Sequence, residues 1–149
     1  MPTLYRRNLR RLQSIRLGDI AELIAIASAA MHTGWLLRRR PIAEVAARSH
    51  VALLQTPADE PPSDDVSALP AWAQRRCALT MFVMRHWPKG DVCLRRSLVL
   101  GHRLASLSPV LVIGVRPGTD QPIDAHAWLR INGVDLDPLS RAYLPFEFA

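Results

Sequence analysis

The two cysteines of this 149-residue chain occupy different sequence contexts. Cys93 follows Asp91, a good helix cap, so that Val92 and Cys93 are expected to be the first two helical residues. At a helix start, unpaired backbone N–H groups and the helix dipole stabilise an anion, which lowers a thiol pKa. Cys77 lies inside an apolar stretch, where a cysteine serves as a small core residue. Cys93 is therefore the candidate nucleophile, with burial in the core as the alternative for this residue considered alone.

A predicted hairpin supplies the other groups that such a nucleophile needs. Residues 125–131 and 134–137 read as two strands, and the Asn132-Gly133 pair between them is typical of a two-residue turn. Because side chains alternate along a strand, one face is expected to lie on the core and the other to be available for chemistry. The core face carries Ala127, Leu129 and Ile131, and the other face carries His126, Trp128 and Arg130.

The two-residue turn also predicts which carboxylate lies next to the histidine. It places Ile131 opposite Val134, so Trp128 is opposite Asp137 and His126 is diagonal to Asp137. Asp135 shares that face but lies one pair further away. We expect Asp137 to orient His126, and Asp135 inherits this role if the turn is longer or shifted.

Cys93, His126 and Asp137 together form a possible nucleophile, base and orienting group. Each has an alternative interpretation when taken alone: His126 as a partly exposed strand histidine without a task, and Asp137 as the end of a strand before Pro138. The combination favours covalent catalysis through a thiolate. Trp128 shares the face of His126, either bordering the site or lying exposed on the hairpin.

The elements that must position these residues indicate an α+β fold. Helices are expected over residues 19–35, with Asp19 as a possible cap, and over residues 41–54, 71–86 and 93–106. In the first helix the apolar spacing singles out Ile20, Leu23, Ile24, Ala27, Met31 and Trp35. Residues 110–115 read as a buried strand ahead of the hairpin, and 56–65 as a loop. Arg95, Arg96 and Arg103 are expected on the solvated or loop-pairing side of the fourth helix, and Gly101 to permit close packing.

Composition bounds the function further. Apolar residues make up 49% of the chain, as in a folded protein, and five arginines without an acidic residue fall within the first sixteen positions. This basic amino end could indicate an acidic partner, a membrane surface or nucleic acid, but no nucleic-acid-binding motif accompanies it. Neither a metal-ligand spacing nor a disulfide framework is present in the sequence, so we expect no metal and no cofactor. The apolar run 20–31 is too short to cross a bilayer, which predicts a cytoplasmic protein without membrane contact.

The segments "CLRRSLVL", "VLVIGV" and "AHAWLRINGVDLD" resemble the transglutaminase-like cysteine peptidases of lasso-peptide biosynthesis, the B proteins related to the microcin-maturation protease. The resemblance covers residues 72–138. It implies a papain-like core with a catalytic helix and a small antiparallel sheet, and a triad at Cys93, His126 and Asp137. Two departures are Leu107-Ser108-Pro109, where a glycine is expected before the first strand, and Arg130, where an acidic residue is common.

The resemblance also implies a reaction and its partners. Such proteins cut the leader from a ribosomal precursor before a separate ATP-dependent cyclase closes the macrolactam ring. The short chain predicts a stand-alone peptidase, with leader recognition on another protein. We expect a helical region at 1–55, an acidic, proline-rich loop at 56–68 and a catalytic core at 69–149, packed as one unit. The docking surface for the recognition protein is expected on the basic, apolar amino-terminal helices.

Two other functions fit the same residues. Acyl transfer, as in transglutaminases or arylamine acetyltransferases, uses the same triad and differs only in that an amine replaces water as the acceptor. A non-catalytic leader-binding module could keep the fold alone, although intact Cys93, His126 and Asp137 argue against it.

Overall fold

The computed structural model describes residues 15–54, 62–88, 92–116 and 124–146. Its principal helices are α2 (Leu17–Leu36), α3 (Ile42–Arg48), α4 (Ala71–Arg85) and α5 (Cys93–Arg103). Its strands are β1 (Ala52–Leu53), β2 (Val110–Arg116), β3 (Asp124–Ile131), β4 (Val134–Asp135) and β5 (Leu144–Pro145). Short 3-10 turns, η1 (Val66–Ala68), η2 (Ala105–Leu107) and η3 (Ser140–Ala142), complete the described elements. The predicted α+β class is confirmed.

The sheet is built around β2 and β3, which pair antiparallel along their full length from Val110↔Arg130 to Arg116↔Asp124. β4 extends the β3 edge, and β1 and β5 lie one after the other along the opposite edge of β2. β1 runs parallel to β2, so the sheet is mixed rather than purely antiparallel as expected.

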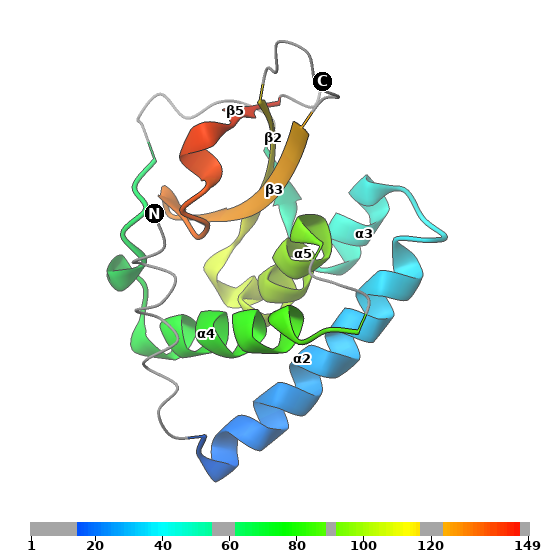
Figure 1. The fold of residues 1–149 in the computed structure, drawn as a ribbon, viewed down its shortest axis with the longest axis vertical. Coiled ribbons are helices and arrows are strands. Elements are labelled where there is room, and N and C mark those ends of the chain that lie inside the picture. Colours follow the sequence, from blue (N-terminus) through cyan, green and yellow to red (C-terminus); the bar gives the residue numbers. More distant parts are fainter. Residues whose placement is uncertain (1–14, 55–61, 89–91, 117–123, 147–149) are drawn as a thin grey trace.

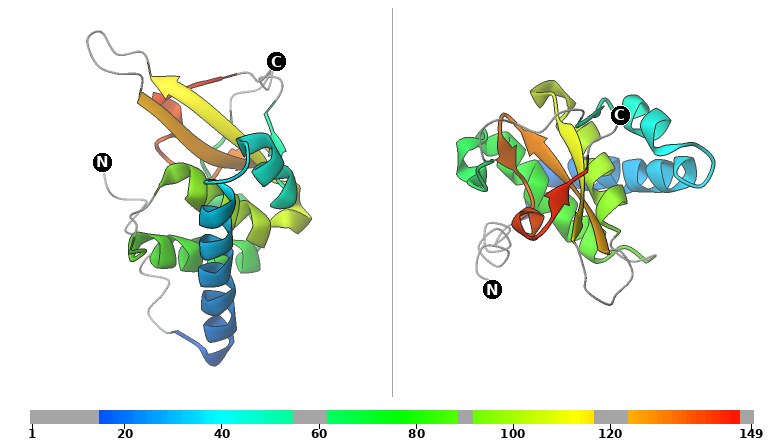
Figure 2. Two further views of the ribbon diagram at one scale, coloured as in Figure 1. Left: turned by 90° about the vertical axis from the view of Figure 1, so that its right-hand side faces the viewer. Right: turned by 90° about the horizontal axis from the view of Figure 1, so that it is seen from above.

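Helix α5 lies between this sheet and the other long helices. Figures 1 and 2 show the sheet on one side of α5, with α2 and α4 on the other. Leu98 of α5 packs with Leu111 and Leu129 of the sheet, whereas Val99 packs with Ile26 of α2 and other residues of α2 and α4. Because apolar contacts hold α5 on both sides, its first turn is fixed relative to β3.

Gly101 sets how closely α5 approaches its neighbours. A Cβ at this position would lie 2.4 Å from Cγ2 of Val51 and 3.4 Å from Cδ2 of Leu129. Absence of a side chain therefore lets the strands lie directly against the helix, as the prediction of close packing requires.

The predicted hairpin register is confirmed. Ile131 pairs with Val134, and the N–H of Leu136 donates to the carbonyl of Leu129 at 2.9 Å. Asn132 and Gly133 both have positive φ, at 49° and 75°, as the primed turns between twisted strands require.

Ser108 carries out the task for which a glycine was expected. Its φ of 51° and ψ of 59° are left-handed, and this reversal leads from η2 into β2. A serine in this conformation meets a modest steric cost that glycine avoids.

The expected helix over 41–54 is wrong in its second half. α3 ends at Arg48, Ser49 follows as its C-cap, and His50 takes a left-handed φ of 56°. The N–H of Val51 then donates to the carbonyl of Ala46, which closes the helix end. The chain beyond it forms β1, because hydrogen bonds to β2 satisfy its backbone.

The helix over 19–35 is confirmed with a different start, and most of the apolar residues that carry its spacing are exposed. Arg16 is the N-cap, and Asp19 at the third position accepts a hydrogen bond from the Arg16 N–H at 2.7 Å. The buried residues of α2 are Asp19, Ile26, Ala30, Thr33 and Leu36, whereas Ile20, Ile24, Met31 and Trp35 are exposed. Leu23 and Ala27 are partly buried. The predicted helical period is confirmed, and the structure shows that most of this apolar face is turned to solvent.

Candidate active site

Cys93 is the first residue of α5, and Val92 is its N-cap. The predicted cap, Asp91, lies outside the described residues, and the helix starts one residue later than expected. The N–H of Arg96 is the first to bond back within this turn, to the carbonyl of Val92, which leaves the N–H of Cys93 without an intrahelical partner. The Cys93 side chain is half-buried at this helix start.

His126 and Asp137 are brought together by the hairpin. Nε2 of His126 lies 3.0 Å from Oδ2 of Asp137, and both side chains are about one-tenth exposed, at 11% and 10%. His126 also hydrogen-bonds Cys93. Because Nε2 of His126 is hydrogen-bonded to Asp137, Nδ1 is the ring nitrogen that can exchange a proton with the thiol.

The ionisation of these three residues is coupled. The hydrogen bond with His126 holds the pKa of the Cys93 thiol below its ordinary value, against burial, which raises it. The hydrogen bond to Asp137, and then that to Cys93, raises the pKa of His126 to about 9. Burial raises the pKa of Asp137, but hydrogen bonds from His126 and the Leu139 N–H hold it below its ordinary value. The arrangement therefore stabilises the thiolate, the imidazolium and the carboxylate relative to their uncharged forms.

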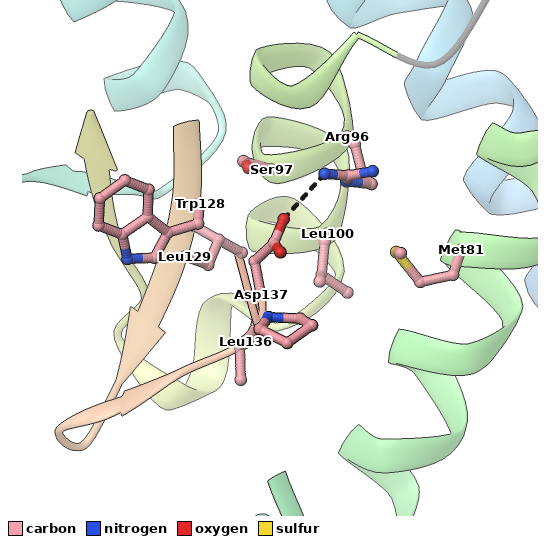
Figure 3. Close-up of a pocket in the computed structure, with 9 residues that line it drawn as sticks. Met81, Arg96, Ser97, Leu100, Trp128, Leu129, Leu136 and Asp137 are labelled. Carbon is pink, nitrogen blue, oxygen red and sulfur yellow. Dashed lines mark hydrogen bonds and ion pairs between the residues drawn. The ribbon is translucent and has the colours of Figure 1, made fainter. Parts of the chain in front are cut away.

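Arg96 is a fourth member of this network that sequence reasoning missed. Its Nη2 donates to Oδ2 of Asp137 at 3.0 Å, the same oxygen that His126 contacts (Figure 3). Of the two alternatives expected for Arg96, a solvated or a loop-pairing side chain, the second holds: its side chain is only 13% exposed and pairs with Asp137 just after β4. Arg96 lies three residues after Cys93 and hence on the same helix face, which is the signal that could have identified it.

The other two arginines of α5 are not simply solvated either. Arg103 forms two hydrogen bonds with Glu22 of α2, at 2.9 and 2.8 Å. Arg95 is partly buried, and its Nε lies 3.4 Å from the position that a Cβ on Gly34 would take. Both arginines thus connect α5 to α2.

Aromatic rings restrain the imidazole. Tyr143 stacks on His126 with ring centroids 5.0 Å apart, and Trp128 does so at 6.1 Å. Trp128 borders the site but is only 1% exposed, which resolves the two predicted environments in favour of a buried ring. Tyr143 was not predicted, because only the return of the chain through η3 brings it here.

Gly114 makes room for these rings. It pairs with His126 across the sheet, and a Cβ on it would lie 2.6 Å from Cη2 of Trp128 and 2.9 Å from Cβ of Tyr143. The glycine of "VLVIGV" therefore allows the rings to lie over β2 beside the imidazole.

A buried hydrogen bond joins the helix of Cys93 to the strand of His126. The hydroxyl of Ser97 donates to the carbonyl of Ala127 at 3.1 Å, and Ser97 is 4% exposed. The link holds the start of α5 against β3, and with it the separation of thiol and imidazole.

Asp135 and Cys77, the alternatives to Asp137 and Cys93, have structural roles. Asp135 is bound by Arg130 through two hydrogen bonds, at 2.7 and 3.2 Å, and both residues are buried. Cys77 is buried in the core between helices and sheet, and burial raises the pKa of its thiol to about 12. Neither Asp135 nor Cys77 has the surroundings of a reactive group.

A cavity of about 30 Å³ lies behind the Arg96–Asp137 pair, between α4 and α5 (Figure 3). Met81, Leu100 and Leu136 supply apolar parts of its wall.

The described residues contain no cluster of three or more histidine, cysteine or acidic residues that could hold a metal ion. His86 and His102 accordingly have no shared ligand geometry; His102 instead stacks on His50 with ring centroids 6.3 Å apart. Among the described helices, none combines the length and apolarity needed to cross a membrane.

Comparison with known proteins identifies the family. Residues 27–144 match the family model described as the transglutaminase-like superfamily, and this segment contains all four residues of the network. The chain therefore belongs to the transglutaminase-like superfamily, a fold of cysteine-protease or acyltransferase type. No curated protein and no solved structure gives a significant match.

Proposed function

We propose that this protein is a cysteine endopeptidase that removes the leader from a ribosomally made lasso-peptide precursor, using Cys93, His126 and Asp137. The observation that carries the proposal is the half-buried thiol at a helix start, hydrogen-bonded to a histidine that a buried carboxylate orients. The superfamily match supports covalent cysteine chemistry. The resemblance of "CLRRSLVL" and "AHAWLRINGVDLD" to lasso-peptide B proteins supports the leader peptide as substrate.

In the proposed reaction the thiolate of Cys93 attacks the scissile carbonyl, and a C–S bond forms. The N–H of Cys93, which has no helical partner, donates to the developing oxyanion. His126 protonates the leaving amine as the C–N bond breaks, which gives a thioester. Neutral His126 then removes a proton from water, which attacks the thioester. The C–S bond breaks and the Cys93 thiolate leaves; His126 keeps this proton as imidazolium, and the acid product loses its own proton to solvent to become the carboxylate.

Asp137 and Arg96 act on this cycle through His126. Asp137 holds Nε2, which keeps Nδ1 directed to the thiol and stabilises the imidazolium. Arg96 fixes the Asp137 carboxylate and adds a positive charge beside it. We expect the leader to be presented by a separate recognition protein, and the product to pass to an ATP-dependent cyclase.

The test is incubation of the purified chain with the precursor peptide encoded beside its gene, with and without the neighbouring recognition protein. The expected result is a leader fragment with a free carboxylate by mass spectrometry, formed slowly without the recognition protein. A parallel reaction with an added primary amine separates hydrolysis from acyl transfer. Predominant amide product would identify an acyltransferase, and leader binding without any turnover would identify a binding module.

A further inference from the structure

The outer face of α2 is apolar although it faces solvent. Its exposed apolar side chains include Leu17, Ile24 and Met31, at 88%, 62% and 68% exposure. We call this face the outer stripe; it consists of Leu17, Ile20, Ala21, Ile24, Ser28, Met31 and Trp35, all exposed. Figure 2 shows α2 running along the outside of the molecule. Clustered exposed apolar residues of this kind mark interaction surfaces.

The acidic side chains of α2 lie on its opposite face, toward the rest of the protein. Asp19 is bound by Arg75, and Glu22 is bound by Arg76 and Arg103, in ion pairs that join α2 to α4 and α5. A surface helix ordinarily buries its apolar face and solvates its charges. Here the acidic side chains fasten the helix to the protein, which leaves the outer stripe for a different contact.

The spacing of the outer stripe fits another helix. Leu17, Ala21, Ile24, Ser28, Met31 and Trp35 follow one another at steps of four, three, four, three and four residues. Alternating four- and three-residue steps form the seam of two packed helices, and this seam extends over about 27 Å. Large and small side chains alternate, so Ala21 and Ser28 leave holes into which knobs of a partner can insert.

Charge indicates the chemistry of that partner. Exposed arginines flank the two ends of the outer stripe: Arg16 before it, and Arg38, Arg39 and Arg40 after it. A second copy of this chain would juxtapose arginines in a parallel pairing and in an antiparallel one, and both arrangements are repulsive. A bilayer is disfavoured because interfacial helices carry basic residues along their polar face, where α2 carries Asp19 and Glu22.

We propose that the outer stripe is a docking surface for an amphipathic helix of a partner protein, with apolar residues at three- and four-residue steps and carboxylates at its ends. The interaction resembles in principle other helix-in-groove contacts, in which apolar anchors give affinity and end charges set direction. This surface is independent of the proposed peptidase activity, since it lies on α2 rather than at Cys93.

The probe is a fluorescent synthetic helix of the length of α2, with leucines at this spacing and glutamates at both ends. A matched peptide carries lysines in place of the glutamates. The full-length protein is expected to bind the acidic peptide more tightly, measured by fluorescence anisotropy. Ile24→Glu with Met31→Glu should weaken binding at least about tenfold, equivalent to about 1.4 kcal/mol, with an unchanged Tm because both residues are exposed.

Two controls make the result specific. Leu144→Glu alters an equally exposed apolar residue on β5, away from α2 (Figure 1), and should leave peptide binding unchanged. Arg38→Glu with Arg39→Glu should reduce the preference for the acidic peptide and improve binding of the lysine peptide.

Three outcomes overturn the proposal. The first is that the acidic peptide does not bind, or that it binds the Ile24→Glu, Met31→Glu variant equally. The second is stripe-dependent dimerisation of the protein, measured by light scattering. The third is stripe-dependent binding to phosphatidylglycerol vesicles without peptide binding, which would assign the surface to a membrane.

Discussion

His126 and Asp137 share a hydrogen bond of 3.0 Å although eleven positions separate them in the chain. The two-residue turn at Asn132-Gly133 produces this proximity, because it fixes the pairing of Ile131 with Val134 and therefore the diagonal between the two side chains. The same register places Asp135 beside Arg130, which donates a hydrogen bond to it. A one-residue shift would turn both aspartates to the other face, and a two-residue shift would place Asp135 opposite Trp128, so the turn determines which carboxylate meets the imidazole.

The two cysteines should differ in reactivity. Cys93→Ala and Cys93→Ser are expected to abolish precursor cleavage, whereas Cys77→Ala should retain it, because the Cys77 thiol is buried with its pKa raised to about 12. Iodoacetamide at neutral pH should label Cys93 in preference to Cys77, as read by peptide mass spectrometry. Normal cleavage by a folded Cys93→Ala protein would end the assignment of the nucleophile.

Substitution of Asp137 should reduce catalysis, whereas substitution of Asp135 should reduce stability. Asp137→Asn is expected to reduce kcat by about a hundredfold or more, because the orienting and imidazolium-stabilising carboxylate is absent. Asp135→Asn breaks a buried ion pair with Arg130, so its main effect should be a lower free energy of unfolding. Cleavage rates normalised to the folded fraction, measured by circular dichroism, distinguish the two. A greater loss of kcat in Asp135→Asn would contradict this interpretation of the hairpin.

The pH dependence should follow the thiol–imidazole pair. Alkylation of Cys93 is expected to gain rate with a midpoint below the ordinary thiol pKa, because His126 stabilises the thiolate. Cleavage should rise over the same range and fall as pH passes about 9, where the imidazolium that protonates the leaving amine is lost. His126→Ala should move the alkylation midpoint upward. An unchanged midpoint in that variant would show that the helix start alone sets the thiol pKa.

Arg96 should behave as a positioning residue. Arg96→Met removes a positive charge beside Asp137, so the pKa of His126 should rise and the alkaline limb of the cleavage profile should move to higher pH. We expect kcat to fall about tenfold, with substantial rescue in Arg96→Lys, which restores a charge without the planar geometry. A lowered Tm with an unmoved alkaline limb would mean that Arg96 is only structural.

Gly114 should resist substitution. A Cβ in Gly114→Ala would lie 2.6 Å from Cη2 of the buried Trp128, so the rings beside His126 must shift. We expect a loss of about 1–3 kcal/mol in the free energy of unfolding, typical of overpacking. Urea titration measures it, and Gly133→Asn, at a turn position with open surroundings, is the control expected to cost less. Equal stability of Gly114→Ala and the wild type would show that the rings have free space.

Local rules predicted the residues that the structure brings together at the site. The helix start at Cys93, the alternation around His126 and the Asn132-Gly133 turn depend on neighbours along the chain, so the sequence alone placed all three in their elements. The diagonal between His126 and Asp137 followed from the turn without knowledge of the rest of the fold.

Only the tertiary structure decided which faces are covered. The sequence predicted the 3.6-residue period of α2. Asp19 and Glu22 turn inward because they form ion pairs with Arg75 and Arg76 of α4 and Arg103 of α5. For the same reason Arg96 is buried against Asp137, and Tyr143 reaches His126 only after the chain returns through η3. A periodic pattern specifies that a helix has two faces; which face is buried depends on the partners that long-range packing supplies.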